Sequence, residues 1–310
     1  MFLYNSIDEF KTLKNAVVTI GTFDGVHIGH QKIINRVNEI AKATGGESVV
    51  LTFFPHPRMV LHPDDHGLVL LNTLEEKKQL MKQYGVQHLI VHPFSQKFSR
   101  TSVTEYVRDM LVNKIGTKKL VIGYDHHFGR NREGTLKDLQ ELGSVYNFEV
   151  EEIPEQDIHD VAVSSTKIRK SLLEGDVAAA KEFLGHDYSL CGIVVKGKEL
   201  GRTLGFPTAN IHVPENYKLI PAKGIYAVTV EIQNAEKHEI GMMSIGTRPT
   251  FDDGDLSIEV NILNFEKNIY GERITVFFKS RLRDELKFDS AEELVKQMEQ
   301  DKLDTLKIFS

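Results

Sequence analysis

The stretch AVVTIGTFDGVHIGHQKIINRVNEIAKATGGESVVLTFF, residues 16–54, decides the fold of the first half of this chain. It begins and ends with short β-branched and apolar runs, at 16–21 and 48–54, which are typical of buried strands. Between them, from near Ile28, isoleucine and valine recur at helical spacing, which indicates an amphipathic helix. Strand, helix and strand in this order predict a βαβ unit, with both strands parallel in one sheet.

The alternation of helices and strands continues beyond this unit. The further predicted elements are helices that open at the capping boxes Thr73–Glu76 and Ser102–Glu105, strands at 87–92 and 118–123, and helices after Thr166 and over 176–184. In the helix after Thr166, we expect Ile168, Leu172 and Leu173 to share one apolar face. Strands separated by helices predict an α/β domain with a Rossmann-like, mostly parallel sheet over residues 1–184.

The second half of the chain has a different rhythm. Apolar strand-like runs follow one another with no helix-length segment between them, at 190–196, 224–232, 240–246, 257–263 and 274–279. Consecutive strands predict an antiparallel sheet or barrel. Ser290 and Glu293, three residues apart, mark the start of a terminal helix. We expect this second domain to span residues 185–310.

Length and composition set limits on the class of protein. At 310 residues the chain exceeds the usual size of one hydrophobic core, and its 41% hydrophobic and 26% charged residues are ordinary for soluble proteins. A net charge of -6 gives no basic footprint for nucleic acid, although a local phosphate pocket is compatible with it. We therefore expect small-molecule substrates, no nucleic-acid partner, and a monomer or weak homo-oligomer.

The compartment is predicted from cysteine and from apolar runs. Cys191 is the single cysteine, so no intramolecular disulfide and no cysteine-rich zinc site can form. The N-terminus lacks the basic start of a signal peptide, and no apolar run approaches the roughly 20 residues of a membrane span. These observations favour a cytoplasmic protein without a membrane partner.

GTFDGVHIGH, residues 21–30, stands where the first strand passes into the first helix. Open α/β sheets bind ligands at this carboxyl edge of their strands. His27 and His30 would project to one side of the helix start, beside unpaired backbone N–H groups that suit a phosphate. Glycines at 21, 25 and 29 allow the backbone to approach a ligand closely.

Other interpretations of this histidine pair stay open at this point. One histidine can cap the helix while the other packs, which is the commoner fate of an isolated pair. Zinc is the weaker alternative, because helical zinc ligands normally stand four residues apart with a third ligand nearby. Neither a G-x-x-x-x-G-K-[ST] nor a G-x-G-x-x-G motif occurs in the chain, so ordinary P-loop and dinucleotide folds lose support.

The segment 21–30 closely resembles the His-x-Gly-His nucleotidyltransferase superfamily. With TFFPHP (52–57), GYDHHFGRNREGT (123–135) and VSSTKIR (163–169), it is similar to the adenylyltransferase module of bacterial bifunctional riboflavin kinase/FAD synthetases. The resemblance implies His27 and His30 as catalytic residues. It implies ATP and phosphate contacts for Gly21, Phe23, Asp24, Gly25, Gly29, Ser165, Thr166 and Arg169, and flavin contacts for Phe54, His56, Pro57 and Asp125. His126 departs from the aromatic residue usual at its position.

GRTLGFPTAN, residues 201–210, is the corresponding motif of the second half. In extended backbone, Thr208 and Asn210 share a face, and oxygen ligands on one face suit Mg²⁺. By composition alone a turn-rich loop explains the segment equally well, because glycine, proline, threonine and asparagine are ordinary turn residues.

The segments downstream of this motif extend the resemblance. KGIYAV (223–228), SIGTRPTF (244–251), SIEVNILNF (257–265) and RLRDELKF (281–288) follow in the order seen in the flavokinase module of the same enzymes. The resemblance implies a six-stranded antiparallel barrel with Glu259 as catalytic base and a magnesium ion on Thr208 and Asn210. It also implies ATP contacts for Gly201, Gly205 and Thr208, and flavin contacts for Arg283, with Arg248 and Arg281 as further candidates.

The implied activity is phosphorylation of riboflavin to FMN by ATP, followed by adenylylation of FMN to FAD with release of pyrophosphate. Three alternatives remain at this point. One is a single-activity enzyme with a degenerate module, and another is a flavin- or nucleotide-binding protein without turnover. The third is a cytidylyltransferase-like enzyme, which the flavokinase pattern disfavours.

Overall fold

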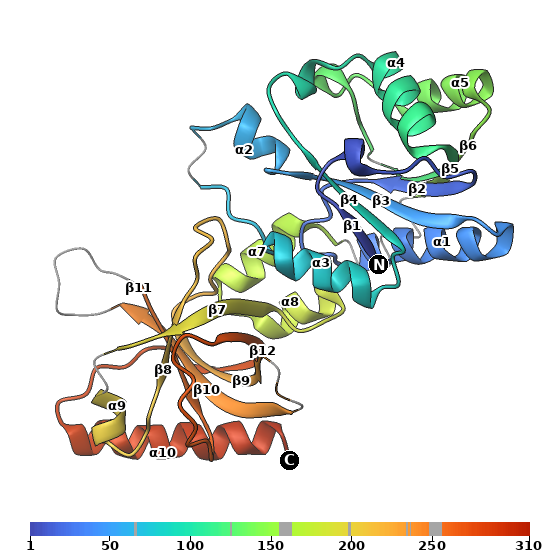
Figure 1. Cartoon of the computed structure of the whole chain (residues 1–310). Helices are drawn as coiled ribbons and strands as arrows, with labels where there is room; N and C mark the ends of the chain where they lie inside the picture. Colours follow the sequence, from blue (N-terminus) through green and yellow to red (C-terminus); the bar gives the residue numbers. More distant parts are fainter. Residues whose placement is uncertain are drawn as a thin grey trace. The chain divides into compact units, whose positions relative to one another are not determined.

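The computed structural model describes residues 1–64, 67–124, 126–154, 163–197, 200–233, 235, 237–247 and 256–310. The chain divides into two compact units, Met1–Ser165 and Thr166–Ser310. Figure 1 shows the elements of both units in the order of the sequence.

The first unit is a six-stranded sheet with helices on both faces (Figure 1). Its strands are β1 (Phe2–Tyr4), β2 (Ala16–Ile20), β3 (Glu47–Phe54), β4 (His88–Pro93), β5 (Thr117–Gly123) and β6 (Glu149–Ile153). Its helices are α1 (Ile28–Thr44), α2 (Pro57–Leu61), α3 (Leu74–Gln83), α4 (Val103–Glu105), the π-helical η3 (Tyr106–Ile115) and α5 (Leu136–Tyr146), with short 3₁₀ turns η1 (Ile7–Glu9), η2 (Phe98–Arg100) and η4 (Arg130–Arg132).

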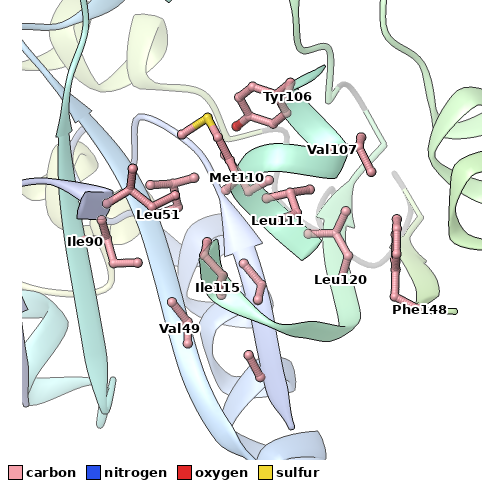
Figure 2. Close-up of a cluster of buried hydrophobic side chains, with 14 of the residues drawn as sticks. Val49, Leu51, Ile90, Tyr106, Val107, Met110, Leu111, Ile115, Leu120 and Phe148 are labelled. Atoms are coloured by element: carbon pink, nitrogen blue, oxygen red, sulfur yellow. The ribbon is translucent and has the colours of Figure 1, made fainter. Parts of the chain in front are cut away.

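All neighbouring strands of this sheet run parallel, in the order β1-β4-β3-β2-β5-β6. A parallel sheet is buried on both faces, so its central strands are apolar throughout, as the fully buried β2 is. Alternate residues of β2 serve the two faces: Val18 packs with η3 and α5, whereas Val17 packs with α1. Figure 2 shows the η3 side, where Met110 and Leu111 lie over strand residues such as Leu51.

The second unit is a closed antiparallel barrel preceded by two helices and followed by one. Its helices are α7 (Ser165–Leu173), α8 (Val177–Leu184), the short α9 (Leu200–Thr203) and α10 (Ala291–Ile308). Its strands are β7 (Ser189–Val195), β8 (Ala209–His212), β9 (Gly224–Ile232), β10 (His238–Thr247), β11 (Leu256–Ile262) and β12 (Arg273–Arg283). They close in the order β10-β11-β8-β7-β12-β9.

The barrel is filled by large side chains and is flanked by α10. Tyr226 and Phe278 are fully buried and meet edge to face with ring centroids 5.2 Å apart. On another face, Val295 and Met298 of α10 pack against a cluster that contains Phe206. The predicted terminal helix is therefore confirmed, and Ser290 caps it by accepting a hydrogen bond from the N–H of Glu293.

The predicted fold class is confirmed, with differences in particular elements. The expectation that Leu173 shares the buried face of its helix was wrong: Leu173 is 58% exposed, because it is the last residue of α7 and lies beyond the buried Ile168 and Leu172. Sequence patterns did not find β1, β6, β8 or α5. β6 has the sequence EVEEI, whose glutamates belong to an edge strand, where Glu151 pairs with Arg36 and Lys119.

Candidate active sites

The turn from β2 to α1, residues 21–27, has an unusual backbone. Phe23, Gly25 and Val26 all have positive φ angles, of 48°, 86° and 42°. For non-glycine residues such conformations cost about 1–3 kcal/mol each and persist only where surrounding contacts determine them. Gly21 is also constrained, because a Cβ there would lie 3.1 Å from the ring of Phe23.

Side chains from four other parts of the first unit hold this turn. The Thr22 carbonyl accepts hydrogen bonds from Lys77 (2.7 Å) and from Thr52 (3.3 Å). The Asp24 carbonyl accepts one from Ser165 (3.0 Å), and the Val26 carbonyl accepts one from Gln31 (2.8 Å). The carboxylate of Asp24 in turn accepts the N–H of Leu71 at 2.9 Å. These hydrogen bonds fix the turn. The start of α1, with its unpaired backbone N–H groups, therefore lies at the carboxyl edge of the sheet.

His27 and His30 lie together at this helix start. Their rings stack with centroids 3.6 Å apart and an interplanar angle of 16°. His27 is the N-cap of α1, and its Nδ1 accepts the N–H of His30 at 3.4 Å. His30 also contacts the ring of Phe23, while its own Nδ1 is buried without a hydrogen-bond partner among the described residues. A buried unpaired imidazole nitrogen is costly and therefore needs an explanation.

The charge state of His30 follows from its surroundings. Burial lowers the pKa of His30 well below its ordinary value, and His27 and Lys77 lower it further by repulsion. The imidazole is therefore neutral at neutral pH. Lys77 itself is 4% exposed, and burial lowers the pKa of its ammonium while Asp24 opposes that shift. The helix start thus combines one buried cation with two aromatic nitrogen heterocycles.

The other predicted residues of the first unit occupy the same edge of the sheet or its continuation. Gly29 is buried in the first turn of α1. At the end of β3, Phe54 packs against the cluster that contains Phe23, and His56 caps α2 by accepting the N–H of Arg58 at 3.2 Å. Pro57 is the first residue of α2. Asp125 lies outside the described residues.

The SSTKIR segment spans the division between the two units. Ser165, the last residue of the first unit, is also the first residue of α7, and its hydroxyl donates to the Asp24 carbonyl. Thr166 is exposed and Arg169 half-buried on the same helix, in the second unit. The predicted phosphate contacts of these three residues remain a prediction.

In the barrel, the motif 201–210 meets the strand that carries Glu259. The Thr208 hydroxyl donates to Glu259 Oε2 at 2.9 Å, and the Ser257 hydroxyl donates to Oε1 at 2.8 Å. The Asn261 amide donates to the Pro207 carbonyl at 2.7 Å, which fixes the loop before β8. Both carboxylate oxygens are thus oriented by hydroxyl groups, and the lone pairs of the Thr208 oxygen remain available to another ligand.

Asn210 stands directly opposite Glu259 in the pairing of β8 with β11. Residues directly opposed in an antiparallel pair present their side chains on the same face, so Thr208, Asn210 and Glu259 form one oxygen-rich group. Gly197 borders it, because a Cβ there would overlap the side-chain amide of Asn210. Hydroxyl, amide and carboxylate oxygens are the donors that Mg²⁺ prefers, so these residues fit the ion.

A cavity of about 70 Å³ adjoins this group and is lined by Thr208, Arg202 and Lys267 among others. Ligand pockets for whole small molecules usually enclose about 300–1,000 Å³, so this cavity suits one phosphate-sized portion of a ligand. Gly201 lies beside it in the turn, where a Cβ would overlap the Phe206 carbonyl, and Gly205 has a positive φ of 84°. Both glycines therefore shape the loop that carries Thr208.

Arg283, the predicted flavin contact, makes a bidentate ion pair in this structure. Its Nε and Nη2 donate to the two carboxylate oxygens of Asp301 on α10, at 2.8 and 2.7 Å. The flavin role of Arg283 remains a prediction. Arg281 donates to the Lys223 carbonyl at 2.7 Å, while Arg248 lies outside the described residues.

The first unit has a larger cleft on its other edge. It encloses about 880 Å³ and is lined by Lys14, Lys118 and Phe148 among others. These residues precede or begin β2, β5 and β6, at the amino ends of the strands. Ligands of open parallel sheets bind at the carboxyl ends, so the edge with His27 and His30 is the candidate site despite the greater volume here.

Sequence reasoning missed three residues that build these sites: Lys77, Ser257 and Gly197. The signal for Lys77 was its place on α3, four residues before the buried Met81 and hence on the same helical face. Ser257 stands two residues before Glu259, so alternation in a strand places both on one face. Nothing local distinguishes Gly197 from an ordinary loop glycine.

Comparison with known families accounts for both units. The family described as FAD synthetase matches residues 9–167, and the family described as riboflavin kinase matches residues 184–309. Together the two matches define a flavin-nucleotide-forming transferase with two domains.

Relatives along the whole chain make the assignment specific. A bifunctional riboflavin kinase/FMN adenylyltransferase of Listeria monocytogenes is 40% identical over 100% of this chain and 98% of its own. The enzymes of the same name from Bacillus subtilis and Escherichia coli are 37% and 35% identical, over 95% and 96% of this chain and 93% of theirs. The chain belongs to the bifunctional riboflavin kinase/FMN adenylyltransferase family.

A solved structure has the same fold. A crystal structure of a protein described as a macrolide-efflux protein from Streptococcus pneumoniae is 33% identical, with a TM-score of 0.87 over 98% of each chain. In the part of the present chain that the structure describes, no helix has the length and apolar character that a membrane crossing requires.

Proposed function

We propose that the chain makes FMN from riboflavin and ATP in its barrel, and FAD from FMN and a second ATP at the helix start of its α/β unit. The observation that carries the proposal is that, within each unit, the residues proposed for its reaction contact one another. His27 and His30 stack in the first unit, and Thr208 donates to Glu259 in the second.

In the barrel, the proposed general base is Glu259. The 5′-hydroxyl oxygen of riboflavin attacks the γ-phosphorus of ATP, the bond to the bridging oxygen breaks, and ADP leaves. The proton of the hydroxyl passes to the Glu259 carboxylate, which Thr208 and Ser257 hold in position. Phosphoryl transfer depends mainly on positioning and on neutralising charge, so one base and one cavity for phosphate suit it.

Thr208 and Asn210 would hold the magnesium ion that this transfer needs. Both offer neutral oxygens, so the ATP phosphates would supply the negative charge of the coordination shell. When bound, the ion neutralises charge on the phosphates. Because the Thr208 hydroxyl donates its hydrogen to Glu259, its oxygen could still act as a ligand of the ion.

In the α/β unit, a phosphate oxygen of FMN attacks the α-phosphorus of ATP and pyrophosphate leaves. The nucleophile is already an anion, so this step requires no general base, in agreement with a site built from histidines and backbone N–H groups. The proposed role of His27 and His30, which stack at the helix start, is to donate hydrogen bonds to the charge that develops on the α-phosphate. Ser165, Thr166 and Arg169 are proposed to hold the leaving phosphates.

The direct test is incubation of the protein with riboflavin, ATP and Mg²⁺, followed by chromatographic separation of the flavins. Formation of both FMN and FAD is expected. His30→Ala is expected to stop FAD formation while riboflavin phosphorylation continues. Glu259→Ala is expected to stop FMN formation from riboflavin while supplied FMN is still adenylylated.

Two results would contradict the proposal. Loss of both activities in folded His30→Ala protein would show that the two sites are not separate. Absence of any product from the wild-type chain would favour a flavin- or nucleotide-binding protein without turnover.

A further inference from the structure

Lys77 is a buried cation next to the proposed adenylyl-transfer site. It lies in the first turns of α3 and is 4% exposed. Its ammonium donates to the Thr22 carbonyl at 2.7 Å. The carboxylate of Asp24 attracts this ammonium, but burial still lowers its pKa. Burial of an ammonium is expensive, so a residue of this kind calls for a functional explanation.

The hydrogen bond from Lys77 ends on the residue next to the strained part of the turn. Thr22 precedes Phe23, whose φ is positive and whose ring touches His30. The same carbonyl already accepts a neutral hydrogen bond from Thr52. The neutral hydroxyl of Thr52 therefore already satisfies the Thr22 carbonyl as a hydrogen-bond acceptor. The positive charge of Lys77 is not required for that purpose.

The site that this charge faces takes up anions. By the proposed function, which this inference rests on and deepens, the helix start receives the α-phosphate of ATP and the phosphate of FMN. An ammonium has three hydrogens, and the described contacts of Lys77 use one of them. A fixed positive charge in a low-dielectric surrounding acts on developing phosphate charge more strongly than a charge in water does.

We propose that Lys77 is a positioning residue of the adenylyl-transfer site: its ammonium fixes the Thr22 carbonyl, and thereby the 23–27 turn and His30, and its charge favours the phosphates bound there. Lys77 acts through its hydrogen bond to the Thr22 carbonyl. Burial does most to keep the neighbouring imidazole neutral, and the charges of His27 and Lys77 add to that effect.

The test compares three variants at the Thr22 carbonyl. Lys77→Met removes the charge and the hydrogen bond, Lys77→Arg retains the charge, and Thr52→Val removes the neutral hydrogen bond alone. Removal of a donor that contacts the transition state directly lowers kcat by about 10²–10³-fold. Because Lys77 acts through the Thr22 carbonyl, the expected fall in FMN adenylylation for Lys77→Met is smaller than this but clearly measurable. Lys77→Arg is expected to retain more activity than Lys77→Met, and Thr52→Val to lose about tenfold or less. Riboflavin phosphorylation is expected to be unchanged in all three.

A second readout does not depend on turnover. The titratable groups that act on His30 are His27 on the turn and Lys77 on α3, and Asp24 acts in turn on Lys77. Lys77→Met is expected to raise the pKa of His30, measured by NMR of the ring nuclei, whereas Thr52→Val is expected to leave it in place.

The outcomes separate this inference from the proposed function. Wild-type protein that makes no FAD would remove the proposed function, while the NMR titration would still report on Lys77. Folded Lys77→Met protein with wild-type kcat for FAD formation would overturn the inference. So would an unmoved His30 titration with a fall in kcat that Thr52→Val reproduces, because Lys77 would then be only a support of the turn.

Discussion

The orientation of the Glu259 carboxylate depends on hydrogen bonds that include one from a residue distant in the sequence. A strand glutamate between Ile258 and Val260 can equally face solvent. In the structure, Thr208 arrives from a loop 51 positions earlier and Ser257 from the same strand, and each hydroxyl donates to one carboxylate oxygen. The carboxylate is thus held as a hydrogen-bond acceptor with a fixed orientation, which is what proton abstraction requires.

The first residue-scale prediction concerns this carboxylate. Glu259→Gln preserves the shape of the side chain but removes its ability to take up a proton, so kcat for riboflavin phosphorylation is expected to fall by about 10²–10⁴-fold. Ser257→Ala is the matched control, because it removes one orienting hydrogen bond of about 1 kcal/mol and leaves the base. Steady-state kinetics with riboflavin measures both. Equal losses in the two variants would contradict a role as base.

The second residue-scale prediction concerns the stability of the first unit in acid. His30 has a lowered pKa, caused first by burial, so between about pH 6.5 and its folded-state pKa the unfolded chain binds a proton that the folded chain refuses. Stability contributed by neutral His30 is fully present above about pH 6.5 and is lost as the pH falls below it, by up to about 1.4 kcal/mol per pH unit.

Urea unfolding followed between pH 7.5 and pH 5 measures this dependence. His30→Gln is expected to flatten it, because glutamine takes up no proton in either state. His92 will retain its own share, since burial lowers its pKa also. An unchanged slope in folded His30→Gln protein would show that His30 is not the group responsible.

At this scale the sequence predicted residues that lie in motifs, and it missed those whose role arises from packing. Thr208, Asn210 and Glu259 were predicted together and lie together. Lys77 and Lys78 are adjacent lysines in one helix, yet one is buried against the turn and the other pairs with the exposed Glu75. Only the position of α3 against the sheet distinguishes them.

At the scale of elements, β8 shows why a site residue can be predicted when its element is not. The strand has only four residues, Ala209–His212, so no pattern of alternation could develop. Its place between β7 and β11 depends on barrel closure, which is a long-range property. In contrast, α1 and α10 carry their own apolar stripe and cap, and both were predicted from local sequence.

The element-scale prediction concerns the attachment of α10 to the barrel. Asp301 on α10 is 6% exposed and forms a bidentate pair with Arg283, whose side chain is 17% exposed. Asp301→Ala leaves a largely buried guanidinium without its partner, and the free energy of unfolding is expected to fall by about 3–5 kcal/mol. Chemical denaturation measures the loss.

A double variant separates packing from ligand binding. Arg283→Met with Asp301→Leu replaces the pair by apolar groups of similar volume, and its stability is expected to lie close to wild type. If Arg283 also contacts flavin, the double variant will be stable with a raised KM for riboflavin. Wild-type stability of Asp301→Ala would contradict the structural importance of the pair.

At the scale of the whole molecule, the two-domain organisation was predictable because the rhythm of the chain changes from alternating helices and strands to consecutive strands. The exact division stays a prediction. The change of rhythm near residue 185 predicts domains of 1–184 and 185–310, the two family matches cover residues 9–167 and 184–309, and contacts divide the chain after Ser165. In the sequence, α7 and α8 continue the alternation of helices and strands of the first half. The local pattern does not show that these helices contact the barrel.

The contacts of these two helices yield the whole-molecule prediction. The Ala222 N–H donates to the Leu172 carbonyl at 2.9 Å, Gly175 lies against the Arg281 guanidinium, and α8 contacts β12. A fragment of residues 166–310 is therefore expected to fold and phosphorylate riboflavin, whereas a fragment of residues 186–310 is expected to be less stable, because each fully buried aliphatic side chain of α8 contributes about 1.5–3 kcal/mol. Thermal unfolding and FMN formation by both fragments test this. Equal stability of the two fragments would place the division at residue 185 and show that α7 and α8 belong to the first domain.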